Sequence, residues 1–334
     1  MNELMRDPIT ARWIIVPLDK MAKVSDLITE QHPKNRDNCP FCYGSETLTP
    51  PEISAHRNQG APNTPNWTIR VVPNKFPALR IEGDLNREGI GVFDIMNGIG
   101  AHEVIIDTPD HFRDMADLTH VETEEVIWTY RARSLDLRKD NRFKYILIFK
   151  NYGKSAGASL EHPHSQLIAL PIVPKRVHEE MEGAARYYDY KERCVFCDIV
   201  REELEEKERI IYNDDKFIAF CPYVSRFAYE VWILPKKHAS DFANIDRDCV
   251  ASFARALRDS LARIKGLLKD PSYNFIIHTS PINGHEREDY HWHVEIMPKL
   301  SKVAGFEWGS GFYVNPVPPY VAAKNLLSVG IPEK

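Results

Sequence analysis

One series of landmarks occurs twice along the 334 residues, and this repetition constrains the fold more than any other feature. Each series begins with a Cys-x-x-Cys pair, continues through an apolar run that ends in a histidine, and closes with a His-x-His motif. The shared order, with nearly equal spacing between the two histidine landmarks, indicates an internal duplication. The two closing motifs follow the earlier histidines by 51 residues (His111 to His162) and by 53 residues (His238 to His291).

Each half also predicts the same succession of secondary structure. The apolar runs at residues 103–111 and 230–238 are rich in Val and Ile and end in turn residues, which is typical of strands. We therefore predict an α+β fold of two duplicated units, each an antiparallel sheet covered by helices. The expected helices are residues 112–130 and 239–268, and further strands are expected at 143–150, 167–170 and 273–278.

The junction between the units is expected in the charged helical stretch at residues 175–193. This gives an N-terminal domain of residues 1–175 and a C-terminal domain of residues 176–334, as suits a chain longer than the ~100–200 residues usual for one domain. The proline-rich residues 315–319 predict an extended segment before a last short helix.

Charge and hydrophobicity restrict the classes of partner. The chain has 43 basic and 48 acidic residues, which are interspersed, and its formal net charge is −5. A concentrated positive face for nucleic acid is therefore not expected. The start of the chain lacks an apolar signal segment, and no stretch approaches the ~20 apolar residues of a membrane span. We expect a cytoplasmic protein without a nucleic-acid or membrane partner.

The cysteine pairs and their matched histidines predict metal sites. Zinc prefers four sulfur and nitrogen ligands in a tetrahedron, and a Cys-x-x-Cys turn supplies two of them. A redox dithiol has the same spacing, and His111 and His238 could instead be helix-capping or surface residues. Because both pairs recur with equivalent histidines, the pattern favours two zinc ions per chain. The predicted ligands are Cys39, Cys42, His111 and His162 at one site, and Cys194, Cys197, His238 and His291 at the other.

The segment at residues 157–171 has the most specific sequence in the chain. His164 follows Pro163 and precedes an apolar run that predicts a buried strand. A neutral imidazole attacks phosphorus well when one ring nitrogen is held as a hydrogen-bond donor and the other faces the substrate. His164 is therefore the candidate nucleophile. Its counterpart in the second half, His293, is followed by Val294 and Glu295 instead of a glutamine, so we expect it to be non-catalytic.

The His-Pro-His-x-Gln pattern at residues 162–166 resembles the active site of the galactose-1-phosphate uridylyltransferases. The duplicated unit resembles the two histidine-triad-like halves of that family, which belongs to the histidine-triad superfamily. Residues 6–16 also resemble the start of its members, so the likeness covers nearly the whole chain. The resemblance implies a zinc-containing homodimer that takes part in galactose metabolism and acts on a nucleotide-sugar and a sugar 1-phosphate.

The resemblance also implies roles for individual residues. His164 would be the nucleophile, and Gln166 would donate a hydrogen bond to the phosphoryl group of the covalent intermediate. Hydrolytic relatives have a histidine at the position of Gln166, and a glutamine cannot donate a proton in the same way, which favours transfer over hydrolysis. The residues that would contact the phosphates or the nucleotide are Asn74, Asn151 and Ser159.

Some residues depart from the better-known bacterial enzymes of the family. Ser165 replaces a glycine, Glu161 an asparagine and Lys75 an aspartate, and the second Cys-x-x-Cys pair is an addition. These features resemble the related plant ADP-glucose phosphorylase.

Three functions therefore follow from the sequence. The first is a UDP-glucose:hexose-1-phosphate (galactose-1-phosphate) uridylyltransferase that acts by a ping-pong mechanism through a nucleotidyl-histidine. The second is an ADP-glucose phosphorylase or adenylyltransferase with the same mechanism. The third is a zinc-organised nucleotide-binding module without turnover, but such a module has no need of both His164 and Gln166.

Overall fold

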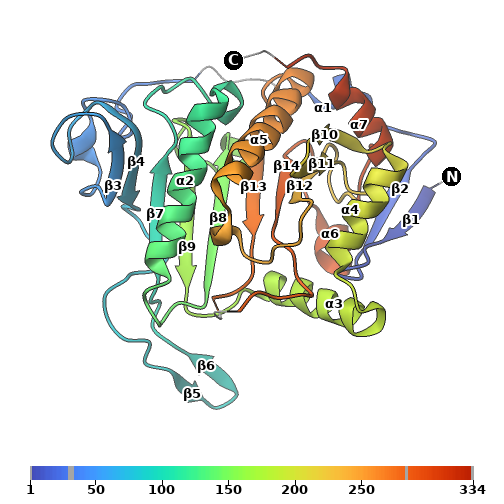
Figure 1. Cartoon of the computed structure of the whole chain (residues 1–334), viewed down its shortest axis with the longest axis horizontal. Coiled ribbons are helices and arrows are strands. Elements are labelled where there is room, and N and C mark those ends of the chain that lie inside the picture. Colours follow the sequence, from blue (N-terminus) through green and yellow to red (C-terminus); the bar gives the residue numbers. More distant parts are fainter. Residues whose placement is uncertain (1, 29–33, 283–284, 332–334) are drawn as a thin grey trace.

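The two halves of the chain share one antiparallel sheet. In this computed structural model, which describes residues 2–28, 34–282 and 285–331, ten strands of the described part pair in the order β10-β11-β12-β14-β13-β8-β9-β7-β4-β3 (Figure 1). The strands of the first half are β3 (Ser54–Arg57), β4 (Trp67–Pro73), β7 (Ala101–Ile106), β8 (Tyr145–Tyr152) and β9 (His164–Leu170). Those of the second half are β10 (Ile210–Asn213), β11 (Phe217–Phe220), β12 (Val231–Pro235), β13 (Tyr273–His278) and β14 (His293–Pro298).

The order of the strands repeats outward from the centre of the sheet. The central strands β8 and β13 pair antiparallel, with Asn151 opposite Asn274. From this pair, β9, β7, β4 and β3 follow on one side, and β14, β12, β11 and β10 follow on the other. The structure thus confirms the predicted α+β fold of two duplicated units, and it joins them edge to edge through their central strands.

One helix of each unit covers the same face of the sheet (Figure 1). These helices are α2 (His120–Leu137) and α5 (Arg247–Leu268), and their buried side chains share one core with the strands. Strand β9 shows how the two faces differ. Leu167 and Ala169 belong to the shared core, whereas His164 and Gln166 project from the other side because successive side chains alternate. We call this other side the site face.

Both long helices begin later than the sequence pattern predicted. The expected starts were Phe112 and Ala239, but α2 begins at His120 and α5 at Arg247. The reason is capping: the side chain of Thr119 accepts a hydrogen bond from the backbone N–H of Glu122, and the side chain of Asp246 accepts one from Cys249. The preceding residues form short 3₁₀ turns, at Met115–Asp117 and Phe242–Asn244.

The remaining helices lie around the second half. The charged stretch at 175–193 forms α3 (Lys175–Lys191), as predicted, and α4 (Val195–Glu206) begins directly after Cys194. The expected last helix is α7 (Pro319–Leu327), which follows α6 (Gly305–Ser310), and a short α1 (Val24–Leu27) lies near the start. None of the helices in the described ranges is both long and apolar enough to cross a membrane.

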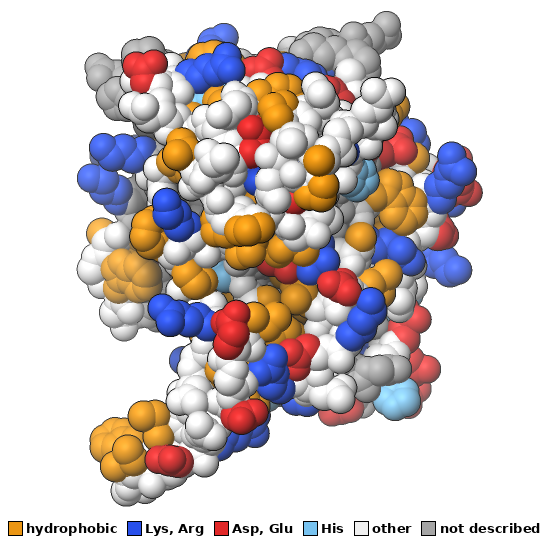
Figure 2. All heavy atoms as spheres, turned by 90° about the vertical axis from the view of Figure 1, so that its left-hand side faces the viewer, with side chains coloured by type: hydrophobic (Ala, Val, Ile, Leu, Met, Phe, Trp, Pro, Cys, Tyr) orange, Lys and Arg blue, Asp and Glu red, His pale blue; other side chains and the backbone are white. Residues whose placement is uncertain are grey.

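Two small sheets complete the fold. Strand β2 (Trp13–Pro17) pairs with β1 (Asn2–Arg6) on one side and with β15 (Tyr313–Val314) on the other, which brings the start of the chain beside its C-terminal part. The hairpin of β5 (Glu88–Ile90) and β6 (Phe93–Ile95) projects from the body as an arm. Hydrophobic side chains gather at its end (Figure 2), where Val92 is 91% exposed and Phe93 72%.

Candidate active site and metal centres

The first Cys-x-x-Cys pair meets the two predicted histidines in a buried cluster. The Sγ atom of Cys39 lies 3.6 Å from Nδ1 of His162, and Sγ of Cys42 lies 3.5 Å from Nδ1 of both His111 and His162. Zinc bonds of about 2.3 Å to sulfur and about 2.0 Å to nitrogen place neighbouring ligands of a tetrahedron about 3.5 Å apart. The four residues therefore fit a zinc ion.

The surroundings of this cluster also favour a cation. The Nε2–H group of His162 donates to the backbone oxygen of Thr108 at 2.8 Å, which leaves Nδ1 free as a ligand. Burial raises the pKa of the Cys39 thiol to about 11 and lowers the pKa of His162 to about 4. A metal ion would stabilise the thiolate that burial disfavours, so binding and thiol deprotonation are coupled.

The second Cys-x-x-Cys pair forms an equivalent cluster. The Sγ atom of Cys197 lies 3.3 Å from Nδ1 of His238 and 3.5 Å from Nδ1 of His291. The ligand atoms of these residues and of Cys194 all lie within 4.8 Å of one another. The Nε2–H group of His238 donates to the backbone oxygen of Arg287 at 2.9 Å, as Nε2 of His162 does in the first cluster. The structure thus brings together both predicted sets of four ligands.

His164, the predicted nucleophile, lies directly after the first cluster's ligand His162 and Pro163, and its ring is held in one orientation. It is the first residue of β9, and its Nδ1–H group donates to the backbone oxygen of His162 at 2.8 Å. This bond leaves the Nε2 lone pair available. The ring is buried, with the edge of Phe41 at 5.3 Å between ring centroids. Burial lowers the pKa of His164 to about 4, so the imidazole is neutral at neutral pH, as a nucleophile must be.

A buried ionic network holds the strands beneath His164. The ammonium group of Lys150 lies 2.7 Å from a carboxylate oxygen of Asp107 and 3.2 Å from one of Asp114. It also donates to the backbone oxygen of His164 at 3.3 Å. Burial alone would lower the pKa of Lys150, but the two carboxylates outweigh this effect and raise it. Lys150 therefore ties the start of β9 to strand β8 and to the residues after β7.

Ser165, one of the departures from the bacterial enzymes, belongs to the same network. Its hydroxyl group lies 2.9 Å from a carboxylate oxygen of Asp107 and 2.5 Å from the hydroxyl oxygen of Tyr130. The side chain is buried on the helix-covered side of the sheet. Ser165 thus anchors the strand that carries the nucleophile, and the hydroxyl points away from the site face.

Replacing Lys150 by methionine is expected to destabilise the fold by about 3–5 kcal/mol, because two buried carboxylates would lose the ammonium group that pairs with both of them. Urea unfolding of the purified variant measures this difference. Lys154→Met, at an exposed position four residues further along, is the control and should change stability little. Equal stability of the two variants would show that the network contributes no net stabilisation.

The predicted substrate residues come from different elements around the site face. Gln166 lies on the site face, two residues beyond His164. Asn151 projects from the same face of β8, where its side-chain oxygen accepts a hydrogen bond from Asn274 at 2.8 Å. Asn74 follows β4 and is linked to Gln166 through the ring of His102. Ser159 is exposed on the loop that precedes β9.

His102 is a residue of this site that the sequence did not single out. Its ring contacts the side chains of Gln166, at 2.8 Å, and Asn74, at 3.1 Å. In the sequence, His102 is only a polar residue near the start of the apolar strand β7. In the structure it lies on the same face of β7 as Val104 and pairs with Ile168 of β9. A single polar residue in an apolar strand is too weak a signal to distinguish a site residue from a surface histidine.

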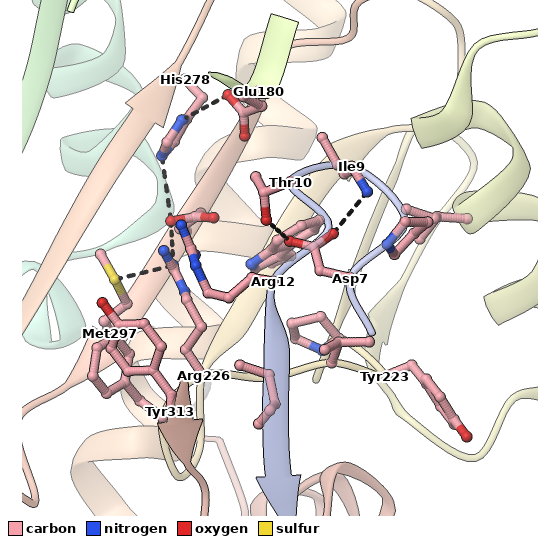
Figure 3. Close-up of a pocket in the computed structure, with 18 of the residues that line it drawn as sticks. Asp7, Ile9, Thr10, Arg12, Glu180, Tyr223, Arg226, His278, Met297 and Tyr313 are labelled. Atoms are coloured by element: carbon pink, nitrogen blue, oxygen red, sulfur yellow. Dashed lines mark hydrogen bonds and ion pairs between the residues drawn. The ribbon is translucent and has the colours of Figure 1, made fainter. Parts of the chain in front are cut away.

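The equivalent position in the second half lacks a free nucleophile. Nδ1 of His293 contacts the backbone oxygen of His291 at 3.1 Å, as in the first half. Its Nε2, however, lies 3.3 Å from a carboxylate oxygen of Glu180, and the ring of His278 stacks on it at 4.7 Å. Figure 3 shows His278 and Glu180 facing each other at the wall of a cavity of about 830 Å³ that Arg12 and Tyr313 also line. These contacts support a non-catalytic His293.

The fold and the site together define the class of protein, which is one built from two histidine-triad-like units. Two histidine-triad-like units, joined through their central strands, place one unobstructed imidazole next to a thiolate–imidazole cluster. The sequence comparisons define the family within this class. Residues 4–174 match the family described as galactose-1-phosphate uridyl transferase, N-terminal domain, and residues 94–329 match a family described as a domain of unknown function. The chain belongs to the galactose-1-phosphate uridylyltransferase family.

Similar proteins include two kinds of enzyme. The ADP-glucose phosphorylase of Arabidopsis thaliana is 34% identical over 98% of this chain and 93% of its own length, and the galactose-1-phosphate uridylyltransferase of Thermotoga maritima is 30% identical over 98% of each. A crystal structure of the Arabidopsis phosphorylase with bound ADP-glucose has a TM-score of 0.82 at 32% identity, covering 99% of this chain and 100% of that one. A uridylyltransferase structure has a TM-score of 0.76 at 25% identity, covering 98% of both.

Proposed function

We propose that the protein is a hexose-1-phosphate nucleotidyltransferase that moves a uridylyl group from UDP-glucose to a sugar 1-phosphate, galactose 1-phosphate in the first place. The observation that carries this proposal is the geometry of His164 on the site face that also carries Gln166. Its Nδ1–H donates to the His162 carbonyl, and Nε2 has no hydrogen-bond partner among the described residues. Membership of the uridylyltransferase family and the Thermotoga maritima relative support the choice of nucleotide and acceptor.

The proposed reaction has two displacement steps. In the first, the Nε2 lone pair of His164 attacks the α-phosphorus of UDP-glucose, the bond from that phosphorus to the bridging oxygen breaks, and glucose 1-phosphate leaves. In the second, a phosphate oxygen of the acceptor attacks the same phosphorus and the nitrogen–phosphorus bond breaks. The Nδ1–H bond to His162 stabilises the positive charge that the ring acquires in the intermediate. Gln166 would donate a hydrogen bond to the phosphoryl oxygens.

Zinc at the two clusters is part of the proposal, one ion held by Cys39, Cys42, His111 and His162 and the other by Cys194, Cys197, His238 and His291. The tetrahedral spacing of sulfur and nitrogen supports zinc in preference to hard cations. Four protein ligands leave no open position, so such an ion supplies folding free energy and no reaction chemistry. In the first cluster the ligand His162 fixes the loop whose carbonyl orients His164.

The assembly and location proposed from the sequence are a cytoplasmic homodimer whose chains comprise domains of residues 1–175 and 176–334. The exposed apolar end of the β5–β6 arm supports association, because soluble monomers seldom leave side chains such as Val92 and Phe93 together in water. Light scattering at several protein concentrations would test the dimer.

The second candidate function is an ADP-glucose phosphorylase, which would transfer an adenylyl group to phosphate through the same histidine. The likeness to the Arabidopsis phosphorylase in sequence and in structure favours this candidate. Ser165 also agrees with it, because it is one of the residues in which this chain resembles the plant enzyme instead of the bacterial ones.

Matched assays distinguish the two candidates. UDP-glucose with galactose 1-phosphate is expected to give a higher kcat/KM than ADP-glucose with phosphate, and parallel initial-rate patterns are expected in both cases because the first product leaves before the acceptor binds. A higher kcat/KM with ADP-glucose and phosphate would establish the second candidate. Absence of turnover with both pairs, in protein that contains its metal, would overturn the proposed function.

A further inference from the structure

We propose that His102 is a positioning residue that fixes the side-chain amide of Gln166, so that its NH₂ group faces the phosphoryl group carried by His164. The inference rests on the proposed function, because it concerns the nucleotidyl intermediate. It adds a residue that no sequence motif indicated and gives the Gln166 amide a defined orientation.

The hydrogen bonds around His102 determine which ring nitrogen carries the proton. The backbone N–H group of Ala78 donates to Nδ1 at 3.1 Å. Nδ1 therefore offers a lone pair, and in the neutral ring the proton lies on Nε2. The backbone oxygen of His102 accepts a hydrogen bond from the N–H group of Asn74 at 2.8 Å, so the backbone is also anchored to the loop after β4.

The protonated Nε2 atom then decides how Gln166 is oriented. It lies 2.8 Å from the side-chain oxygen of Gln166, which must act as the acceptor. With the oxygen engaged, the NH₂ group is the part of the amide that remains for a substrate. A freely rotating amide would present its oxygen to an anionic phosphoryl group in one of its two orientations, and that contact is repulsive. Fixing the amide removes this unproductive orientation.

The same ring connects Gln166 to the predicted nucleotide-contacting loop. The side-chain oxygen of Asn74 accepts a hydrogen bond from the N–H group of Phe76, so the Asn74 amide nitrogen carries the free hydrogens. This nitrogen lies 3.1 Å from Nε2 of His102. Two donors this close to each other are favourable only when each has an acceptor of its own. The Gln166 oxygen satisfies His102, and a substrate oxygen would satisfy Asn74.

A double-mutant cycle tests the coupling between His102 and Gln166. The variants are His102→Leu, Gln166→Ala and the double variant, and the quantity measured is the single-turnover rate of His164 nucleotidylation with UDP-glucose and with ADP-glucose. Each single change is expected to lower this rate about tenfold or more, with little change in the donor concentration that gives half the maximal rate. The double variant should be no slower than Gln166→Ala, because His102 acts only through Gln166.

A conservative variant separates positioning from a structural role. His102→Gln keeps an N–H donor within reach of the Gln166 oxygen and should recover most of the rate that His102→Leu loses, while thermal unfolding and metal content stay the same in both. Multiplicative losses in the double variant, or a wild-type rate in His102→Leu, would overturn the inference. Should His102→Leu fail to fold, an equal loss in the folded His102→Gln and Gln166→Ala variants would count against it. Failure of the proposed function would appear separately, as the absence of any adduct on the wild-type protein.

Discussion

Replacing His164 by alanine is expected to abolish nucleotidyl transfer, with a fall in kcat on the order of 10⁴-fold or more. The reason is that, in the proposed mechanism, Nε2 of this ring forms the bond to phosphorus, while the neighbouring ring of His162 faces the cysteine cluster through Nδ1 and the Thr108 carbonyl through Nε2. The fold and the metal content should be unchanged, because His164 is not among the ligands. Steady-state assays and elemental analysis of the same preparation measure both quantities.

The second half of the chain supplies the matched control. His293 occupies the position equivalent to His164, with its Nδ1 against the His291 carbonyl, but Glu180 closes its Nε2 side. His293→Asn should therefore keep kcat within a few-fold of the wild-type value. Near-normal transfer by the His164→Ala protein would contradict the covalent mechanism. Initial-rate patterns that require both substrates to be bound together would do the same.

Loss of the first metal cluster is expected to have the largest effect on stability. Cys39→Ala removes one of four buried ligands, and apparent zinc binding energies of about 10–16 kcal/mol contribute to folding in structural sites. We expect this variant to lose one equivalent of zinc and to unfold at least about 10 °C below the wild-type protein, or to be insoluble. Elemental analysis of the wild-type protein should give two zinc ions per chain.

The control for this prediction is Cys249→Ala, which changes a half-buried cysteine that lies outside both clusters. It should retain two zinc ions and the wild-type unfolding temperature. If Cys39→Ala retained both ions and the same unfolding temperature, a metal at the first cluster would have no structural role. A wild-type protein with one zinc ion would limit the proposal to a single cluster.

The fold was predictable from the sequence where a pattern was repeated. The landmarks occur in the same order in both halves, and the two histidine positions are 51 residues apart in the first half and 53 in the second. Each half accordingly builds the same strands around the same kind of cluster. The predicted starts of α2 and α5 were wrong, because the capping residues Thr119 and Asp246, and not the turn residues after the preceding strands, determine where the helices begin. Capping depends on a single polar side chain, so the pattern of apolar residues did not indicate where each helix begins.

The candidate site was predictable only as far as its motifs extend. The His-Pro-His-x-Gln segment gave His164 and Gln166 as candidates, but side chains that contact them come from other strands. Lys150 approaches the His164 carbonyl from β8, and His102 approaches Gln166 from β7. Both are polar residues in largely apolar strands, and their partners become neighbours only through the strand register. Such contacts cannot be inferred from spacing along the chain.

The central claim is that His164 carries the nucleotidyl group, and mass spectrometry of the intact protein tests it most directly. Protein incubated with UDP-glucose in the absence of an acceptor should gain the mass of one uridylyl group, and peptide mapping should place the group on His164. If the protein is an ADP-glucose phosphorylase, incubation with ADP-glucose should add the mass of one adenylyl group. His164→Ala should gain no mass with either donor. An adduct on another residue, or steady turnover with no adduct on His164, would contradict the account.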